Sequence, residues 1–115
     1  MDNRRQVGEG GEERAAQYLK RQGYKIVERN WHTPYGELDI VASSGKELVF
    51  VEVRTLETPN LLFPEESVGA GKQRRLARLA TAYVQQIKFE RDWRIDVIAI
   101  DRDGLRHIKN AVSLW

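Results

Sequence analysis

The segment Lys72–Lys88 constrains the fold of this 115-residue chain more than any other stretch. Its apolar residues recur at the three- and four-residue spacing of a helix with one buried face. They are Leu76, Leu79, Ala80, Tyr83, Val84 and Ile87. The segments on both sides of it are instead short and rich in β-branched and aromatic residues, which is typical of strands. One long helix between groups of strands predicts an α/β fold.

The remaining elements follow from apolar spacing and from turn residues. We expect a helix at Glu12–Gln22 and strands at Tyr24–Trp31, Glu37–Ala42, Glu47–Arg54, Arg94–Ile100 and Leu105–Ile108. Short connections between the first three strands predict an antiparallel meander. Thr55–Gly71 has two prolines and no clear periodicity, so we expect a flexible loop at about 55–71. The predicted order is αβββαββ in a single domain, residues 1–115.

Composition excludes several classes of protein. The chain has no cysteine, which rules out disulfides, thiolate metal sites and a cysteine nucleophile. Its longest apolar runs are four residues, far short of the roughly 20 that a membrane-spanning helix needs. The first residues are polar and charged, unlike a signal peptide. We therefore expect a cytoplasmic protein without a membrane partner.

Positive charge gathers at the start of the long helix, although the net charge is only +2. Lys72, Arg74, Arg75 and Arg78 fall within seven residues that contain no acid. Such a run is either a solvated helix face or a surface that binds phosphate groups. The run alone leaves both interpretations open.

Glu12 stands out among the acidic residues. It precedes Ala15, Ala16 and Leu19 by three, four and seven residues, so it shares their inward helix face. Its neighbour Glu13 belongs to the solvated face. A carboxylate on an apolar face requires a structural or functional reason.

A second group of acids lies on the second and third strands. If Ser43–Lys46 forms a four-residue hairpin loop, Asp39 opposes Phe50 and Glu37 opposes Glu52. Asp39 and Glu52 are then diagonal neighbours, with backbones roughly 7 to 8 Å apart. One face of the hairpin would carry Glu37, Asp39, Glu52 and Arg54.

Carboxylates this close repel one another unless a positive charge lies between them. A divalent cation supplies that charge, and oxygen ligands without cysteine favour Mg²⁺ or Mn²⁺ over Zn²⁺. Magnesium commonly binds one or two carboxylates together with substrate phosphates, which indicates phosphodiester chemistry. The alternative is that these acids are solvated and pair with nearby arginines.

With these residues in place, the chain resembles the YraN-like family of small bacterial proteins over roughly residues 8–100. That family resembles the archaeal Holliday junction resolvases, which have a restriction-endonuclease-like fold with a central mixed sheet flanked by helices. The matching residues are Gly8, Gly11, Glu12, Ala15, Ala16, Leu19, Gly23-Tyr24, Asn30-Trp31, Gly36–Val41, Val49–Val53, Lys72 and Arg94–Val97.

The resemblance implies a metal-dependent endonuclease that acts on DNA, branched DNA included, with Mg²⁺ or Mn²⁺ as cofactor. Asp39 and Glu52 match the metal-binding acids, and Glu12 matches a helix-borne acid of the resolvase-like branch. Glu37 would support these ligands. Arg54 and Lys72 would contact the scissile phosphate, so the expected catalytic set is Glu12, Asp39, Glu52, Arg54 and Lys72. The neighbouring phosphates would be bound by Arg74, Arg75 and Arg78.

The sequence departs from the family pattern at two positions. Arg54 stands where a lysine follows the second acid by two residues, and Leu56 stands where a further basic residue is usual. Two alternatives therefore stay open: a DNA-binding module that does not cleave, and an adaptor that binds a protein through Thr55–Gly71. Resolvases act as dimers, so the resemblance also implies a homodimer.

Overall fold

The computed structural model of the chain describes residues 3–56 and 69–112, with side chains from residue 10 onward. Its elements are α1 (Asn3–Arg21), β1 (Lys25–Thr33), β2 (Gly36–Ser44), β3 (Glu47–Thr55), α2 (Ala70–Ile87), β4 (Trp93–Asp101) and β5 (Gly104–Ile108). The predicted order αβββαββ is confirmed.

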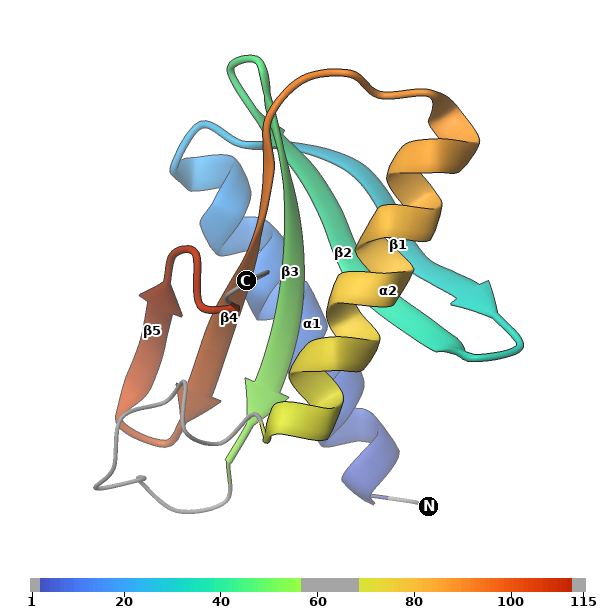
Figure 1. The fold of residues 1–115 in the computed structure, drawn as a ribbon. Coiled ribbons are helices and arrows are strands. Elements are labelled where there is room, and N and C mark those ends of the chain that lie inside the picture. Colours follow the sequence, from blue (N-terminus) through green and yellow to red (C-terminus); the bar gives the residue numbers. More distant parts are fainter. Residues whose placement is uncertain (1–2, 57–68, 113–115) are drawn as a thin grey trace.

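The strands form one mixed sheet with the spatial order β1-β2-β3-β4-β5 (Figure 1). The first three strands are antiparallel neighbours, which confirms the predicted meander. β3 and β4 are parallel, and β5 is antiparallel to β4. A parallel pair requires a crossover connection, and α2 belongs to that crossover.

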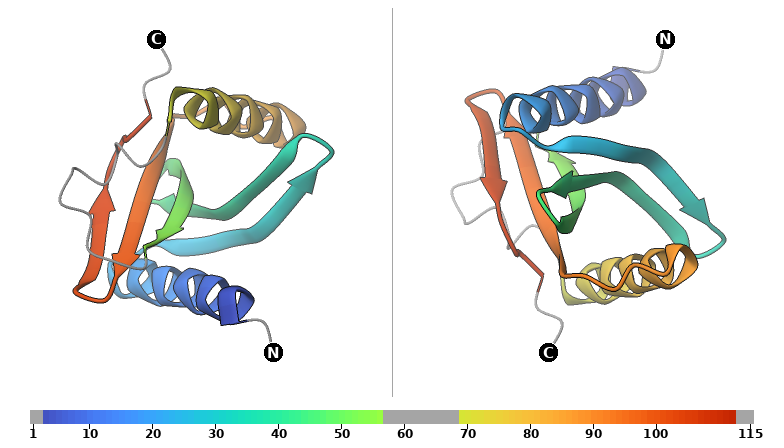
Figure 2. Two further views of the ribbon diagram at one scale, coloured as in Figure 1. Left: turned by 90° about the horizontal axis from the view of Figure 1, so that it is seen from below. Right: turned by 90° about the horizontal axis from the view of Figure 1, so that it is seen from above.

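The two helices cover opposite faces of the sheet (Figure 2). Each helix packs on its own apolar cluster. The cluster under α2 includes Leu38, Val41, Phe50, Leu76, Leu79, Tyr83 and Val97. The cluster under α1 includes Ala15, Ala16, Leu19, Ile40, Val51 and Ile98. The fold class, an α/β sheet flanked by helices, agrees with the restriction-endonuclease-like expectation.

The amino-terminal helix is longer than predicted. It begins at Asn3 and continues through Gly10 and Gly11, whereas the sequence predicted a start at Glu12. The glycines suggested a boundary because glycine has a low helix propensity. A Cβ atom on Gly11 would lie 2.4 Å from Thr55 Oγ1. The glycine therefore allows a close approach of helix to strand.

The register of the β2–β3 hairpin also differs from the prediction. Gly45 has a φ of 61°, and the loop contains two residues, so Ser44 pairs with Glu47. Asp39 consequently does not oppose Phe50, because the pairing is shifted by two residues. An even shift keeps each side chain on its predicted face, which is why the acids still converge.

Most of the predicted flexible loop lies outside the described residues, which omit 57–68. At its two ends, Thr55 belongs to β3, and α2 begins at Ala70, two residues before the predicted start. Among the described residues, no helix combines the length and the apolar character needed to cross a membrane.

Candidate active site

A kink in the β1–β2 hairpin creates the candidate site. Asn30, in β1, has a left-handed backbone with φ of 55°. The paired positions run from Arg29↔Ile40 to Trp31↔Leu38 and skip Asn30 and Asp39. Leu38 packs in the α2 cluster, whereas Ile40 packs in the α1 cluster, although residues two apart normally share a face. Asp39 therefore lies at the point where alternate side chains of β2 change from one face of the sheet to the other.

Asp39 also marks the point where β2 leaves β3. The last paired residues of this ladder are Ile40 and Val51. Beyond them, Asp39 Oδ2 accepts a hydrogen bond from the backbone N–H of Val53, at 2.9 Å. The β1–β2 hairpin bends away from β3 beyond this region (Figure 2). Where β2 separates from β3, the Asp39 carboxylate therefore accepts a β3 backbone hydrogen bond that a strand partner would otherwise accept.

Three carboxylates meet where β2 separates from β3. Glu12 on α1 and Glu37 and Asp39 on β2 each offer an oxygen, and these oxygens lie within 4.8 Å of one another. Glu12 points inward as predicted and is half-buried, whereas the side chain of Glu13 points outward and pairs with Arg29 at 2.8 Å. Residues from two distant elements thus form one acidic cluster.

Burial and crowding favour the protonated forms of Asp39 and Glu12. Burial raises the pKa of Asp39 to about 7, and the nearby charge of Glu52, followed by that of Glu12, adds to the increase. Burial and then Glu37 raise the pKa of Glu12, against the opposing effects of Arg29 and of a hydrogen bond from Asn30. The cluster holds more negative charge than its described neighbours neutralise.

Glu52 lies beside this cluster and is paired with a lysine of α2. It is 6% exposed, and its Oε1 is 2.7 Å from Nζ of Lys72. Lys72 comes from the first turn of α2 and points toward the sheet, because it lies one turn before Leu76 on the buried stripe of the helix. The sequence reasoning grouped Glu52 with Glu12 and Asp39 as ligands. The structure places Glu37 in the tight group of three and gives Glu52 a cationic partner.

Arg54 follows Glu52 on the same face of β3 and is half-buried. Its Nε is buried and has no hydrogen-bond partner among the residues that the structure describes. A buried guanidinium nitrogen without a partner is costly, which makes Arg54 a candidate for binding an anion near the acids.

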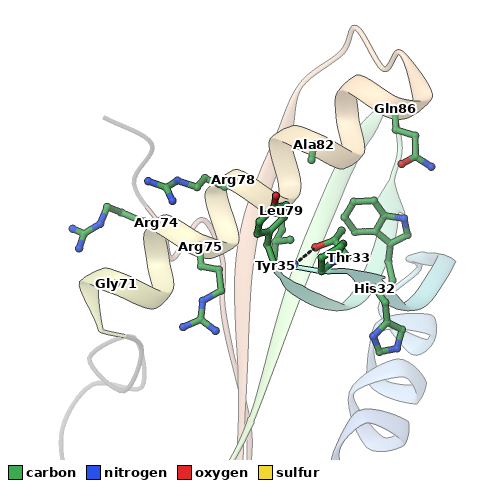
Figure 3. Close-up of a pocket in the computed structure, with 12 residues that line it drawn as sticks. His32, Thr33, Tyr35, Gly71, Arg74, Arg75, Arg78, Leu79, Ala82 and Gln86 are labelled. Carbon is green, nitrogen blue, oxygen red and sulfur yellow. Dashed lines mark hydrogen bonds between the residues drawn. The ribbon is translucent and has the colours of Figure 1, made fainter.

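The three predicted phosphate-binding arginines line a groove next to the site. The groove runs between α2 and the β1–β2 turn, and Figure 3 shows the arginines extending from the amino-terminal half of α2. The wall residues are Trp31, His32, Thr33, Pro34, Tyr35, Gly71, Arg74, Arg75, Arg78, Leu79, Ala82 and Gln86. The run of positive charge found in the sequence thus lies along this groove. The aromatic side of the groove was not predicted from the sequence.

Sequence reasoning also missed the part played by Asn30. Its backbone conformation kinks the hairpin at Asp39, and its side chain hydrogen-bonds Glu12. Asparagine adopts left-handed conformations more readily than most residues. An asparagine inside a strand pattern was therefore the available signal for an irregularity at this point.

Comparison with known proteins identifies the relatives of this chain. Residues 11–100 match the family described as Uncharacterised protein family UPF0102. The chain belongs to the UPF0102 family. This confirms the predicted membership in the YraN-like family.

Several UPF0102 proteins match most of the chain. The protein of Thermodesulfovibrio yellowstonii is 43% identical over 92% of this chain and 95% of its own length. The protein of Syntrophotalea carbinolica is 48% identical over 85% of this chain and 80% of its own length. The protein of Caldicellulosiruptor saccharolyticus is 39% identical, with 96% and 91% covered. This chain thus spans most of the length of these relatives.

Proposed function

We propose that this UPF0102 protein is a metal-dependent endonuclease that cleaves DNA phosphodiesters, with branched DNA among its substrates. The observation that carries the proposal is the meeting of the Glu12, Glu37 and Asp39 carboxylates within 4.8 Å, with Lys72 beside the neighbouring Glu52. Four elements of the fold contribute these side chains. The basic groove adjoins them.

The donor set fits a hard divalent cation. All candidate ligands are carboxylate oxygens, which suit Mg²⁺ and Mn²⁺. Burial first, and neighbouring carboxylates second, raise the pKa values of Asp39 and Glu12, and a bound cation would offset both effects. Glu12, Glu37 and Asp39 would hold the cation. Glu52 would either join them or remain paired with Lys72.

The bound cation would supply a water of lowered pKa and stabilise charge on the phosphate. The chain itself would position the DNA. Arg54 would grip a phosphate oxygen of the scissile group with its guanidinium, and Arg74, Arg75 and Arg78 would bind the neighbouring phosphates without reading sequence. Because these phosphate contacts are electrostatic, binding should weaken as salt increases.

Lys72 supports catalysis in spite of Arg54. A lysine in such a site neutralises developing charge and helps to place the attacking water. Arg54 cannot exchange a proton at neutral pH. The Lys72 ammonium reaches Glu52 from α2, so an ammonium group, which Arg54 does not provide, is available from another element.

A second candidate function is DNA binding without cleavage. The short Lys72–Glu52 ion pair favours it, because an ammonium held by a carboxylate is less free to act on a phosphate. Both candidates predict metal and DNA affinity, and only turnover separates them. An adaptor for a protein partner predicts neither affinity.

The deciding experiment is a cleavage assay with Mg²⁺ or Mn²⁺ on labelled duplex, single-stranded and four-way-branched DNA. We expect cleavage by the native protein and a loss of at least about 100-fold in Glu12→Gln and Asp39→Asn, because each removes a metal ligand. Glu13→Gln is the matched control. It changes the same residue type one position along α1, where the carboxylate is exposed.

The outcomes separate the candidates. Equal activity in Glu12→Gln and Glu13→Gln would contradict the nuclease proposal. Metal-independent DNA binding without cleavage would leave a binding module, and the absence of both activities would leave an adaptor. Arg54→Lys and Lys72→Ala test which of the two residues has the role of the usual lysine. If Lys72 has that role, Lys72→Ala should lose activity and Arg54→Lys should not. Light scattering on the same samples tests the expected homodimer.

A further inference from the structure

The groove between α2 and the β1–β2 turn has two chemically different sides. Arg74, Arg75 and Arg78 make one side cationic, and the wall residues that the structure describes include no carboxylate. Trp31 and Tyr35 supply aromatic rings on the other side. Cationic and aromatic side chains together are characteristic of surfaces that bind nucleic acid strands through phosphates and bases.

Tyr35 is the most exposed large hydrophobic residue in the described part of the chain. It is 84% exposed, compared with 47% for Val27 and 46% for Ile87. It stands at the tip of the hairpin, and the groove lies against it (Figure 3). Trp31 behaves differently, because its ring packs edge-on against Tyr83 with centroids 5.2 Å apart. The ring available to a ligand is therefore that of Tyr35.

The turn that carries Tyr35 is held in place. Thr33 Oγ1 accepts a hydrogen bond from the Tyr35 backbone N–H at 3.0 Å and donates one to the Gly36 carbonyl at 3.1 Å. Gly36 lies against α2, since a Cβ atom there would be 3.3 Å from Leu79 Cδ1. Because this turn is already ordered, little conformational entropy is lost when a ligand binds to the Tyr35 ring.

The groove is continuous with the acidic site. His32 lines the groove, and its Nδ1 is 3.0 Å from Oε2 of Glu37, one of the three clustered carboxylates. On the other wall, Gly71 precedes Lys72, whose ammonium is paired with Glu52. A strand bound in the groove would therefore run up to the carboxylates.

We infer that this groove binds an unpaired DNA strand next to the acidic cluster, with a base stacked on Tyr35 and phosphates on Arg74, Arg75 and Arg78. The inference rests on the proposed function and adds to it the form of the substrate, a junction between paired and unpaired DNA. In a duplex, both faces of each base are covered by neighbouring bases. Only an unpaired base can offer its face to a side chain.

The test measures equilibrium binding in EDTA, where metal-dependent cleavage does not occur. The probes are labelled DNAs of equal length: a blunt duplex, a single strand, and a duplex with a single-stranded extension. Tyr35→Ala should weaken binding to the last two by about 10-fold, because stacking on one aromatic side chain contributes about 1 to 3 kcal/mol. Blunt-duplex binding should be unchanged, and Tyr35→Phe should bind like the native protein.

A stacking probe separates direct contact from an indirect structural effect. With 2-aminopurine in the unpaired extension, the native protein and Tyr35→Phe should quench its fluorescence, and Tyr35→Ala should not. Val27→Ala, which also removes an exposed apolar side chain but lies outside the groove, is the control and should match the native protein.

Each other result overturns the inference. An equal effect of Tyr35→Ala on all three DNAs, or on none, would show that Tyr35 does not recognise unpaired bases, even if binding still depends on Arg75. That outcome would leave the proposed function intact. Failure to bind any of these DNAs would contradict both proposals.

Discussion

Two aspartates of the sheet, the buried Asp96 and the half-buried Asp39, have opposite environments. Asp96 on β4 is fully buried, and its oxygens lie 2.9 Å from Arg94 Nε, 2.7 Å from His107 Nε2 and 2.9 Å from the Asn110 backbone nitrogen. Burial alone would raise its pKa, but hydrogen bonds from His107 and Arg94 outweigh burial and lower it. Asp39 lies among acids, and its pKa is raised to about 7.

The difference separates an aspartate with a structural environment, Asp96, from one whose environment suits the proposed metal site, Asp39. Asp96 belongs to a partnered network in which His107 also contacts Tyr18, and Arg94 also contacts Tyr24 and Glu47. Such networks order a core. Among the described residues, Asp39 is hydrogen-bonded by the Val53 backbone N–H and by the Glu52 side chain, and the neighbouring charges that act on it are those of Glu52 and Glu12, a pattern that fits the proposed cation site.

The largest expected effect is on the Asp96 network. Asp96→Asn should lower the free energy of unfolding by about 3 kcal/mol or more, because the largely buried Arg94 would keep its charge without its fully buried counter-charge. Urea denaturation followed by circular dichroism measures the change. A loss below about 1 kcal/mol would show that Glu47 suffices as the partner of Arg94 and would weaken the contrast with Asp39.

Metal should stabilise the region around Asp39 and leave Asp96 unaffected. At a concentration 100 times its dissociation constant, Mn²⁺ should add about 2.7 kcal/mol to the stability of the native protein, which corresponds to a melting-temperature increase of roughly 10 °C. Asp39→Asn should abolish most of the increase, and Glu13→Gln should preserve it. An equal increase in both variants would place the metal elsewhere.

The two aspartates should also give opposite pH dependences. The raised pKa of Asp39 means that the folded state retains a proton that the unfolded state has lost, so stability should fall as pH rises from about 3.8 to about 7 without metal. The lowered pKa of Asp96 contributes stability that is present above about 3.8 and is lost as pH falls further.

Asp39→Asn isolates the first effect. An asparagine oxygen can still accept the hydrogen bond from Val53, while the charge is gone. At pH 8 in EDTA, the variant should therefore be more stable than the native protein by about 1 kcal/mol, and its stability should vary less between pH 5 and 8. Thermal melts at several pH values test this. A destabilised variant at pH 8 would make Asp39 a structural residue like Asp96.

The smallest expected effect concerns the kink at Asn30. Asn30→Ala should cost about 1 kcal/mol more than Asn30→Gly, since alanine is strained in the left-handed conformation and glycine is not. Both variants lose the hydrogen bond to Glu12. Equal stabilities in urea denaturation would mean that the hairpin straightens, and metal affinity should then fall in both.

Most of the fold could be predicted from sequence because its elements have clear periodicity. The stripe from Leu76 to Ile87 and the run from Leu48 to Val51 identify a helix and a strand almost without ambiguity. The start of α1 could not be predicted, because the packing of Gly11 against Thr55 overrides the low helix propensity of glycine.

The site was predictable where side-chain direction alone decides it. Glu12 and Lys72 point inward because of their positions on apolar helix faces, and Asp39 and Glu52 keep their face under an even register shift. The closeness of Glu37 to Glu12 and Asp39 depends on the kink at Asn30, which is a single backbone conformation. The aromatic wall of the groove depends on the packing of the β1–β2 turn against α2. This long-range contact cannot be predicted from a local sequence pattern.

The close contact between α1 and the sheet shows how the proposed site could be lost without the loss of any of its charged residues. Only a hydrogen atom fits above Thr55 at position 11, and Glu12 is the next residue along the helix. If a single added methyl group at that position displaced the helix rather than Thr55, the adjoining carboxylate would move away from its two companions. Such a chain would retain every acid and every arginine and still lack the proposed cation site.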